Sequence, residues 1–507
     1  MNIIKSTGTF SFFTIISRLL GYLRDILIAI FLGAGPLADA FFVAFRIPNT
    51  FRRLFSEGTF NAAFIPSYSS LTNKKKAEYF ANNIFSLLII GLLFFIVLIE
   101  ILAPLFVFLI APGFEGNYEK MQLAINLTRI TIPFLLFISL ASFFSAILNS
   151  HNKFAIASDA PIILNILLIG VLLFGKILND QLVYYLSFAV TLSGVFQLIF
   201  LYFFVKKYYS PHFTFIININ KKVKVFFKKL LPSIFSSGVT QINILVGTII
   251  ASFQASAVSY LYYADRVYQI NLAIAGIAIG TVILPQLSKY VHNKKLKKID
   301  LIQNKALELS LFLSIPATIA LLIASEEIIS SLFGYGSFDE ESVKNSAKAL
   351  FYFGLGLPAF SLIKVFSAFF FARHDTKIPF YISLISVLLN ILISIIFFRE
   401  IGFLIIPIAT TISSWFNAIF LFFVLKHRKL FSFNLLFISR FFKILIASSL
   451  MGIFFYYLIH FFHDKFLFEQ VLKSLYLIGS VILGMTFYIF VSIFIKAFNI
   501  SDISLKY

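Results

Sequence analysis

The sequence predicts an all-α polytopic membrane protein with about fourteen transmembrane helices, arranged as two pseudo-symmetric six-helix lobes plus two C-terminal helices. Its composition is the first observation behind this prediction. Hydrophobic residues fill 60% of the 507 positions, 68 residues are phenylalanine, and only 13% are charged. No soluble fold could cover so much apolar surface with polar groups, so most of the chain is expected to face lipid.

Apolar runs of about 20 residues between polar breaks predict the spans in order. The first six cover residues 10–32, 38–55, 84–110, 123–148, 161–174 and 182–205. The next six cover residues 231–253, 268–287, 307–333, 347–371, 379–398 and 403–425, and the last two cover residues 441–461 and 475–495. We therefore divide the chain into an N-terminal lobe (1–220), a C-terminal lobe (221–430) and a C-terminal helix pair (431–507).

An internal repeat is the second observation. Residues 188–201 match residues 408–421 at an offset of about 220, residues 144–146 recur at 366–368, and residues 164–167 recur at 389–392. Chance agreement in an apolar alphabet is the alternative, but three matches in order at nearly one offset favour duplication. Copies with an even number of spans share one orientation, so a substrate path between the lobes is expected.

The distribution of charge predicts topology. Basic residues gather at 74–76, 206–207, 221–229, 289–298, 373–377 and 426–429, and the intervening loops carry acidic residues. The excess of 42 basic over 22 acidic residues, 42 − 22 = +20, therefore follows the positive-inside rule. We expect both termini in the cytoplasm, basic loops on anionic membrane lipids, and no nucleic-acid partner. The amphipathic segment 221–230 is expected to lie at the interface as a helix.

The first two predicted helices contain charges that are costly in a membrane. Ser17, Arg18, Gly21, Arg24 and Asp25 fall within an arc of about 120° at 100° per residue. Arg24 or Arg18 can pair with Asp25 inside this arc. Gly21 leaves space between them.

The second predicted helix carries a similar polar face. Asp39, Arg46, Asn49 and Arg53 share an arc, and Arg52 lies on its flank. Arg46 can pair with Asp39. Alternatively, Arg46, Arg52 and Arg53 lie at the cytoplasmic end as topology residues.

Arginines outnumber carboxylates among these positions. The arginines are Arg18, Arg24, Arg46, Arg52, Arg53 and Arg266, and the carboxylates are Asp25, Asp39, Glu57 and Asp265. A guanidinium group inside a helix bundle needs an anion or water, and its geometry suits bidentate oxyanions such as phosphate. The excess predicts a phosphate-bearing ligand. Lys364 faces the same cavity, snorkels or pairs locally, and Asn165 and Asn390 are expected to form interhelical hydrogen bonds.

The sequence lacks the residues that several kinds of catalytic and nucleotide-binding site require. The chain has no cysteine, no phosphate loop, no paired catalytic carboxylates and no Ser-His-Asp arrangement. Of the seven histidines only His460 and His463 have helical spacing, which does not favour a metal site. We therefore expect a transporter, not an enzyme, with no cofactor and no metal. It would use the membrane potential or a monovalent ion gradient, or transport passively.

One long ordered motif resembles the MurJ (MviN) family of lipid II flippases, which belongs to the multidrug/oligosaccharidyl-lipid/polysaccharide (MOP) exporter superfamily. The motif covers residues 17–25, 33–35, 39–41, 44–49, 52–55, 57–58 and 63–66, and residues 263–266 continue it. The resemblance implies the MOP exporter fold, with two lobes around a V-shaped cavity. It also implies a hydrophobic groove for the undecaprenyl tail, formed by the last two helices.

The resemblance also implies residue roles. Substrate-binding residues for the diphosphate in the cavity would be Arg18, Arg24, Arg266, Ser17, Asp25 and Arg52; gating or structural residues would be Asp39, Asn49, Glu57, Gly21, Arg53 and Lys364. The implied partner is lipid II, undecaprenyl-diphosphate-MurNAc-pentapeptide-GlcNAc, moved by a monomer in the bacterial cytoplasmic (inner) membrane. Carboxylates of a sodium site in some relatives are replaced here by residues such as Gln241 and Asn390, which does not favour sodium coupling.

Other functions stay open from sequence. A flippase for a different polyprenyl-linked glycan would need the same arginines. A drug exporter of the superfamily would favour acidic or aromatic cavity residues for organic cations, and the excess of arginines argues against it. An enzyme acting on a polyprenyl diphosphate would need a metal-binding acidic motif or a nucleophile with its base at the membrane face, and the sequence shows neither. A signalling scaffold would not need its arginines, so Arg24→Ala separates it from the transport functions.

Overall fold

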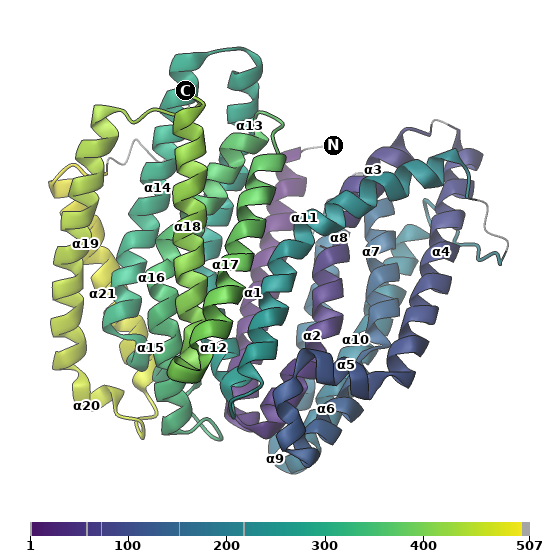
Figure 1. Cartoon of the computed structure of the whole chain (residues 1–507), viewed down its shortest axis with the longest axis horizontal. Helices are drawn as coiled ribbons and strands as arrows, with labels where there is room; N and C mark the ends of the chain where they lie inside the picture. The colour runs from purple at the N-terminus through teal and green to yellow at the C-terminus, as the bar shows by residue number, and fades with distance from the viewer. Residues whose placement is uncertain (1–2, 57–58, 72, 152, 216–218, 499–507) are drawn as a thin grey trace. The chain divides into compact units, whose positions relative to one another are not determined.

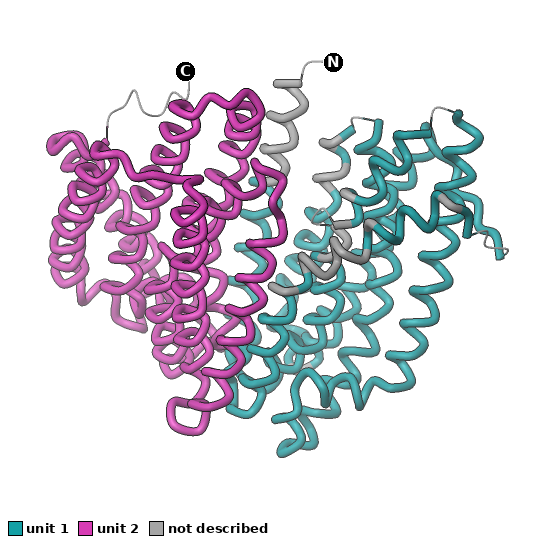
Figure 2. Tube along the Cα trace, turned by 45° about the horizontal axis from the view of Figure 1, so that its top comes forward, with its two compact units in different colours: residues 1–259 teal, residues 260–507 magenta. Residues whose placement is uncertain are grey.

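A computed structural model describes residues 3–56, 59–71, 73–151, 153–215 and 219–498 of the chain. These residues are almost entirely helical, as predicted, and contain no strand (Figure 1). Packing divides the chain into two compact units, Met1–Ser259 and Tyr260–Tyr507, which are coloured separately in Figure 2. The boundary falls inside a helix. The predicted lobe boundary at residue 220 rests on the sequence repeat and stays a prediction.

Unit 1 contains thirteen elements before the boundary helix. They are α1 (Ile3–Leu32), α2 (Pro36–Ser56), α3 (Thr59–Ser69), α4 (Lys74–Ile101), α5 (Ala103–Ile110), η1 (Pro112–Gly116), α6 (Tyr118–Thr131), α7 (Phe134–Ser150), α8 (Phe154–Leu172), α9 (Gly175–Leu178), η2 (Asn179–Gln181), α10 (Leu182–Val205) and α11 (Lys221–Ala251). Within the unit α1 packs on α8, α2 on α6, and α10 on both α7 and α8.

Unit 2 begins within α12 (Ala257–Leu272). Its further elements are η3 (Ala273–Ala278), α13 (Ile279–His292), α14 (Leu296–Ile323), α15 (Ser325–Phe333), α16 (Glu340–Phe371), α17 (Lys377–Ile401), η4 (Gly402–Leu404), α18 (Ile405–His427), α19 (Leu435–Phe461), α20 (His463–Phe466) and α21 (Lys473–Phe494). Within the unit α16 packs on α14 and α18, and α19 lies beside both α14 and α21 (Figure 1).

Nine helical segments of the described chain are long and apolar enough to cross a membrane. One of them, Lys377–His427, holds two predicted spans as α17 and α18, and the shorter apolar stretches Ala160–Leu172 and Gln241–Ala251 fall within α8 and α11. The membrane-spanning, all-helical class is thus confirmed. The count of fourteen stays a prediction.

Three predicted spans are interrupted. The predicted span 84–110 divides at Leu102, where Pro104 opens α5, and the predicted span 123–148 divides next to Pro133. Proline lacks an N–H and disfavours a helical residue before it, which explains both breaks. The predicted span 307–333 divides at Ala324, whose φ of −125° is not helical. These breaks were missed because hydrophobicity continues across them.

An aromatic cluster forms much of the core of unit 1. Phe60 and Phe64 of α3 contact Phe143 of α7 and Phe226 of α11, with ring centroids 5.7 Å apart for Phe60–Phe226 and 5.2 Å apart for Phe64–Phe143. α3 was not predicted as a helix. Its buried rings explain why it forms.

The segment 221–230 differs from its prediction. It continues without a break into α11, and its apolar side chains Val223, Phe226 and Leu230 are buried in the aromatic cluster rather than in headgroups. The apolar face therefore packs on protein and not on headgroups, contrary to expectation, whereas a position of the helix at the membrane interface stays a prediction. Lys222 and Lys224 are exposed, so contact of these lysines with anionic lipids stays a prediction.

Candidate functional site

A buried ion pair lies in the C-terminal third of α1. Arg24 and Asp25 are only 8% and 2% exposed, and both Nε and Nη2 of Arg24 donate to Asp25 Oδ1, at 3.0 and 2.7 Å. This confirms the predicted Arg24–Asp25 pairing. A buried guanidinium is stable only when both its charge and its N–H groups are satisfied. The remaining nitrogen of Arg24, Nη1, donates to a residue of another helix.

Asn165 of α8 completes the cluster. Its Oδ1 accepts from Nη1 of Arg24 at 2.9 Å, and its Nδ2 donates to the backbone carbonyl of Ser17 at 2.9 Å. A Cβ on Gly21 would lie 3.6 Å from Asn165 Nδ2, an ordinary van der Waals contact, so the amide lies against α1 without requiring glycine at this position. The interhelical hydrogen bonds predicted for Asn165 are confirmed, and they hold the arginine that was predicted to bind the ligand.

Arg18 differs from Arg24 in its surroundings. It is exposed and, within the described part of the chain, makes no hydrogen bond or ion pair. Two arginines on one helix are therefore in different states, one neutralised by a carboxylate and one available to an external anion. A phosphate can reach Arg18 directly but must replace Asp25 or Asn165 to bind the fork of Arg24.

Asp39 of α2 is fully buried, and its partners differ from those predicted. Its Oδ2 accepts from Lys120 Nζ of α6 at 2.6 Å. Its Oδ1 accepts from the backbone N–H and the hydroxyl of Ser259, at 2.9 and 2.5 Å. The predicted pairing of Arg46 with Asp39 is therefore wrong, because a lysine and a helix terminus distant in sequence take both oxygens.

The end of α2 carries the next predicted residues. Nε of Arg52 donates to Oδ1 of Asn49 at 3.1 Å, one turn apart, and Arg53 is half-buried. Glu57 lies outside the described residues. The roles of these residues stay predictions.

Unit 2 holds the remaining predicted residues. Nη2 of Arg266 donates to the hydroxyl of Tyr262 at 3.0 Å, and the guanidinium lies 4.7 Å from that ring. Asp265 accepts from Gln269. Lys364 of α16 is exposed. The stem of its side chain lies close to Gly276, because a Cβ on that glycine would lie 3.4 Å from Cγ of Lys364.

The second repeat contains an asparagine at the position that matches Asn165. Asn390 of α17 donates to Thr410 Oγ1 of α18 at 3.1 Å and accepts from Ser394 at 3.1 Å. The interhelical bond predicted for Asn390 is confirmed. Asn165 and Asn390 stand at matching places in the predicted repeat; Asn165 contacts Arg24, whereas Asn390 contacts Thr410 and Ser394.

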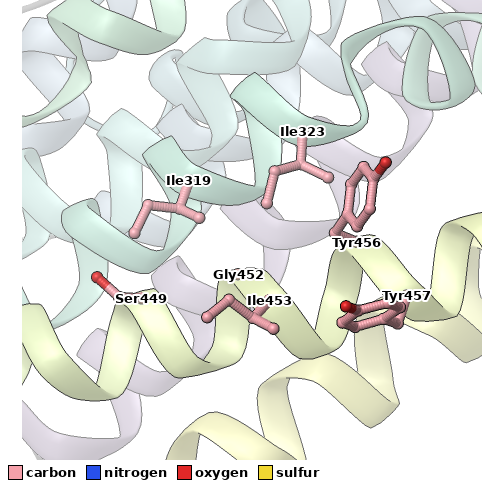
Figure 3. A pocket seen from close by; sticks show the side chains of 7 residues that line it. All are labelled: Ile319, Ile323, Ser449, Gly452, Ile453, Tyr456 and Tyr457. Atoms are coloured by element: carbon pink, nitrogen blue, oxygen red, sulfur yellow. The ribbon is translucent and has the colours of Figure 1, made fainter.

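An apolar groove lies between α14 and α19. It has a volume of about 410 Å³ and is lined by Ile319, Ile323, Ser449, Gly452, Ile453, Tyr456 and Tyr457, as Figure 3 shows. Gly452 makes it possible, since a Cβ there would lie 2.6 Å from Cγ2 of Ile319. Tyr456 and Tyr457 line one end of the groove, and the ring of each carries a hydroxyl group.

Comparison with known proteins identifies the family. A family model described as lipid II flippase MurJ matches residues 28–477. The chain belongs to the MurJ family. It is 35% identical over 507 residues to a probable lipid II flippase MurJ of Rickettsia prowazekii (strain Madrid E), covering 98% of this chain and 99% of that one. It is 37% identical over 473 residues to a protein of the same description from Rhizobium tropici, covering 91% of this chain and 88% of that one.

Solved structures agree with the family. A lipid II flippase MurJ in an inward closed conformation matches with a TM-score of 0.82 and 27% identity, covering 96% of this chain and 98% of the other. An inward-facing MATE transporter of the MOP superfamily matches with a TM-score of 0.65 at 16% identity, covering 81% and 94%, and so shares the fold alone. The predicted MurJ resemblance and MOP exporter fold are confirmed, and the family is one of transporters, not enzymes.

Sequence reasoning missed two partners in this MurJ-family site. Lys120 was grouped with no span, since it stands at the start of α6 beside loop residues, and Ser259 precedes the predicted start of its helix at residue 268. No periodicity connects either with Asp39, which is 81 residues from Lys120 and 220 from Ser259. Only the fold brings the three together.

Proposed function

We propose that this MurJ-family protein moves lipid II from the cytoplasmic to the outer leaflet by alternating access, so that it supplies peptidoglycan synthesis. The buried Arg24 cluster is the observation that carries the proposal. A membrane-spanning helix that keeps one arginine neutralised by its own carboxylate, and a second one exposed, suits a ligand that brings a diphosphate. The family match supplies the identity of that ligand.

The two arginines of α1 suggest an order of contacts. Arg18 meets the diphosphate first because it is exposed, and the phosphate oxygens then replace Asp25 at Arg24. Asp25 acts as an internal anion that keeps the buried charge compensated when no substrate is bound. Arg52 and Arg266 are further arginines for which the resemblance implies diphosphate binding, and within unit 1 the exposed Arg18 is the proposed first contact.

The undecaprenyl tail needs an apolar surface that stays in lipid. The groove of Figure 3 is apolar along α14 and α19 and suits a chain of methyl-branched isoprene units. Tail binding there would leave only the headgroup and diphosphate to cross the polar interior. This proposal extends the tail function from the C-terminal helix pair to α14.

Topology follows from the charge pattern. Both termini would lie on the cytoplasmic side of the inner membrane, where the basic loops contact anionic lipids. Asp39 would then lie toward the outer face, because its partner Lys120 stands beside the acidic residues Glu115 of η1 and Glu119 in the first turn of α6. The family resemblance implies a gating role for Asp39, and the charge pattern leads us to propose that it acts at the outer gate.

The decisive experiment uses bacteria depleted of their own lipid II flippase. The unaltered chain, Arg18→Ala, Arg24→Ala and Arg266→Ala are expressed, and an external enzyme that cleaves lipid II only at the outer face reports exposure. We expect the unaltered chain to restore cleavage and each variant to lower it by at least about tenfold, the effect of losing a charge-assisted contact. Arg399→Ala, an exposed arginine at the end of α17, is the matched control and should leave cleavage unchanged.

Two outcomes would contradict the proposal. If the well-expressed unaltered chain restores no cleavage, the substrate is another polyprenyl-linked glycan, and the same assay with other lipid-linked donors identifies it. If the arginine variants restore cleavage fully, the phosphate-binding function of the cavity is wrong.

A further inference from the structure

The side chain of Asp39, a residue of α2, lies next to the first turn of α12. The helix starts at Ala257, and its first N–H groups have no partner within the helix. Asp39 Oδ1 accepts from the N–H of Ser259 at 2.9 Å, so the carboxylate caps α12 from another helix and faces the positive end of its dipole. The residue that holds this carboxylate in place is Lys120.

Lys120 has the properties of a positioning group. It is 8% exposed, its Nζ lies 2.6 Å from Asp39 Oδ2 and 4.0 Å from the ring centre of Phe114, and α6 and α2 pack along one another. The ammonium and Ser259 occupy different oxygens of the same carboxylate. Separation of Ser259 would therefore leave the ion pair in place.

The turn between α11 and α12 is held at a second point. The backbone N–H of Gly113 in η1 donates to the hydroxyl of Ser252 at 3.0 Å. A Cβ on Gly113 would lie 2.4 Å from backbone atoms of Phe253 and Ser252, so only glycine fits there. The next residue, Phe114, is the buried ring beneath Lys120.

We propose that Lys120, together with the η1 turn, clamps the start of α12 and keeps Asp39 in place as its cap. The clamp consists of Gly113, Phe114 and Lys120 on one side and Ser252 and Ser259 on the other, with Asp39 between them. Resting on the proposed function, this makes Lys120 the residue that holds Asp39 against Ser259 while the outer gate is closed. Without Lys120 the closed state would contain a buried carboxylate with no counter-charge, which favours separation of Asp39 from the start of α12 and its hydration.

The first test uses the absence of cysteine in this chain. Ala257→Cys, at a fully buried position beside the clamp, provides a single thiol whose reaction with a maleimide reports separation of the start of α12. The purified protein in nanodiscs is labelled, so the readout requires no substrate and no known orientation. We expect Lys120→Met to raise the labelling rate by about tenfold or more, because Asp39 loses its counter-charge.

A double variant separates a specific pair from general damage. Asp39→Asn with Lys120→Met removes both charges and keeps an oxygen that can accept from Ser259. Labelling should return to within about threefold of the unaltered rate. A swap of the two charges, Asp39→Lys with Lys120→Asp, keeps an ion pair but places a cation at the α12 N-terminus, and we expect it to stay fast.

Glycine variants test the second contact independently of charge. Gly113→Ala should increase the labelling rate of the Ala257→Cys reporter, because the added methyl group displaces the α11–α12 turn. Gly116→Ala, in the same turn but with nothing within 4 Å of its Cβ, is the matched control and should not change the rate.

Either of two results would overturn the clamp. One is an unchanged labelling rate in both Lys120→Met and Gly113→Ala; the other is a double variant that labels as fast as Lys120→Met alone. Because labelling is independent of transport, an intact clamp in a chain that fails the lipid II assay would refute the proposed function and not the clamp.

Discussion

Asn165 decides how Arg24 is presented, although its own side chain carries no charge. It links Arg24 to the Ser17 carbonyl and so ties α8 to the polar face of α1. The sequence predicted both the arginine and an interhelical asparagine, because each is costly in a membrane when unsatisfied. It could not predict that they bond to each other, since no periodicity connects two residues that are 141 positions apart.

We expect Asn165→Ala to impair lipid II exposure and lower stability. The variant leaves the Ser17 carbonyl and one Arg24 donor without this partner, which costs about 1–3 kcal/mol and lets the guanidinium shift. Thermal unfolding in detergent and the external cleavage assay measure the two effects. Asn390→Ala is the matched control from the second repeat: it also loses an interhelical bond, made with Thr410 in place of an arginine. Equal loss of export in both variants would contradict the positioning of Arg24 by Asn165.

At the scale of elements, the sequence predicted most spans and missed their interruptions. Pro316 and Pro358 lie inside α14 and α16, whereas Pro133 stands at a break. Composition around these prolines is equally apolar, so the difference depends on whether neighbouring helices satisfy the freed carbonyl. The predicted span at 268–287 missed the first turns of α12, which begin at Ala257 and contain Ser259, the residue that Asp39 caps.

The turn before α21 depends on one buried lysine. Nζ of Lys473 donates to the carbonyls of Gly334 and Phe468, both at 2.7 Å, and lies 4.6 Å from the ring centre of Tyr335. We expect Lys473→Met to loosen the α20–α21 turn, because two buried carbonyls lose their donor at a cost of about 1–3 kcal/mol each. Hydrogen exchange of residues 462–475 measures it. Lys465→Met, an exposed lysine on the same turn, should leave exchange unchanged, and equal effects of both would show that Lys473 holds nothing in particular.

The groove of α14 and α19 gives a prediction about substrate length. Ser449→Trp fills the groove and should lower transport of a long-chain polyprenyl substrate by about tenfold while sparing a short-chain analogue, because only the long tail needs the apolar contact. Transport of both substrates in proteoliposomes is the measurement. Leu450→Trp, the adjacent exposed position outside the groove lining, is the control. A similar loss with both substrates would remove the groove from tail binding.

At the scale of the whole molecule, composition and loop charge predicted a membrane-spanning helical protein, and the MOP exporter fold was implied by the motif resemblance. The match to a solved MurJ structure at a TM-score of 0.82 confirms that class. Composition could not predict two compact units with a boundary at Ser259, because that boundary depends on which helix faces meet. Composition could not predict the pairing of Lys120 with Asp39 either, because the two side chains meet only in the folded unit.

The membrane potential is expected to drive the transport cycle. Lipid II is a net anion, and an inside-negative potential favours its outward movement by about 2.3 kcal/mol per charge per 100 mV, unless protein charges that move with it cancel the effect. Asp25 remains on α1 when the diphosphate takes its place at Arg24. The negative charge of Asp25 therefore stays in the protein, and its displacement from Arg24 does not cancel the charge of the substrate. We therefore expect transport in proteoliposomes to accelerate when a potassium gradient with valinomycin makes the donor side negative, and to slow when the gradient is reversed. Arg24→Ala vesicles give the background rate, and a sodium gradient at zero potential tests ion coupling separately. Equal rates at all imposed potentials would mean that protein charge neutralises the substrate throughout the cycle, and would leave an ion gradient or passive exchange as the driving force.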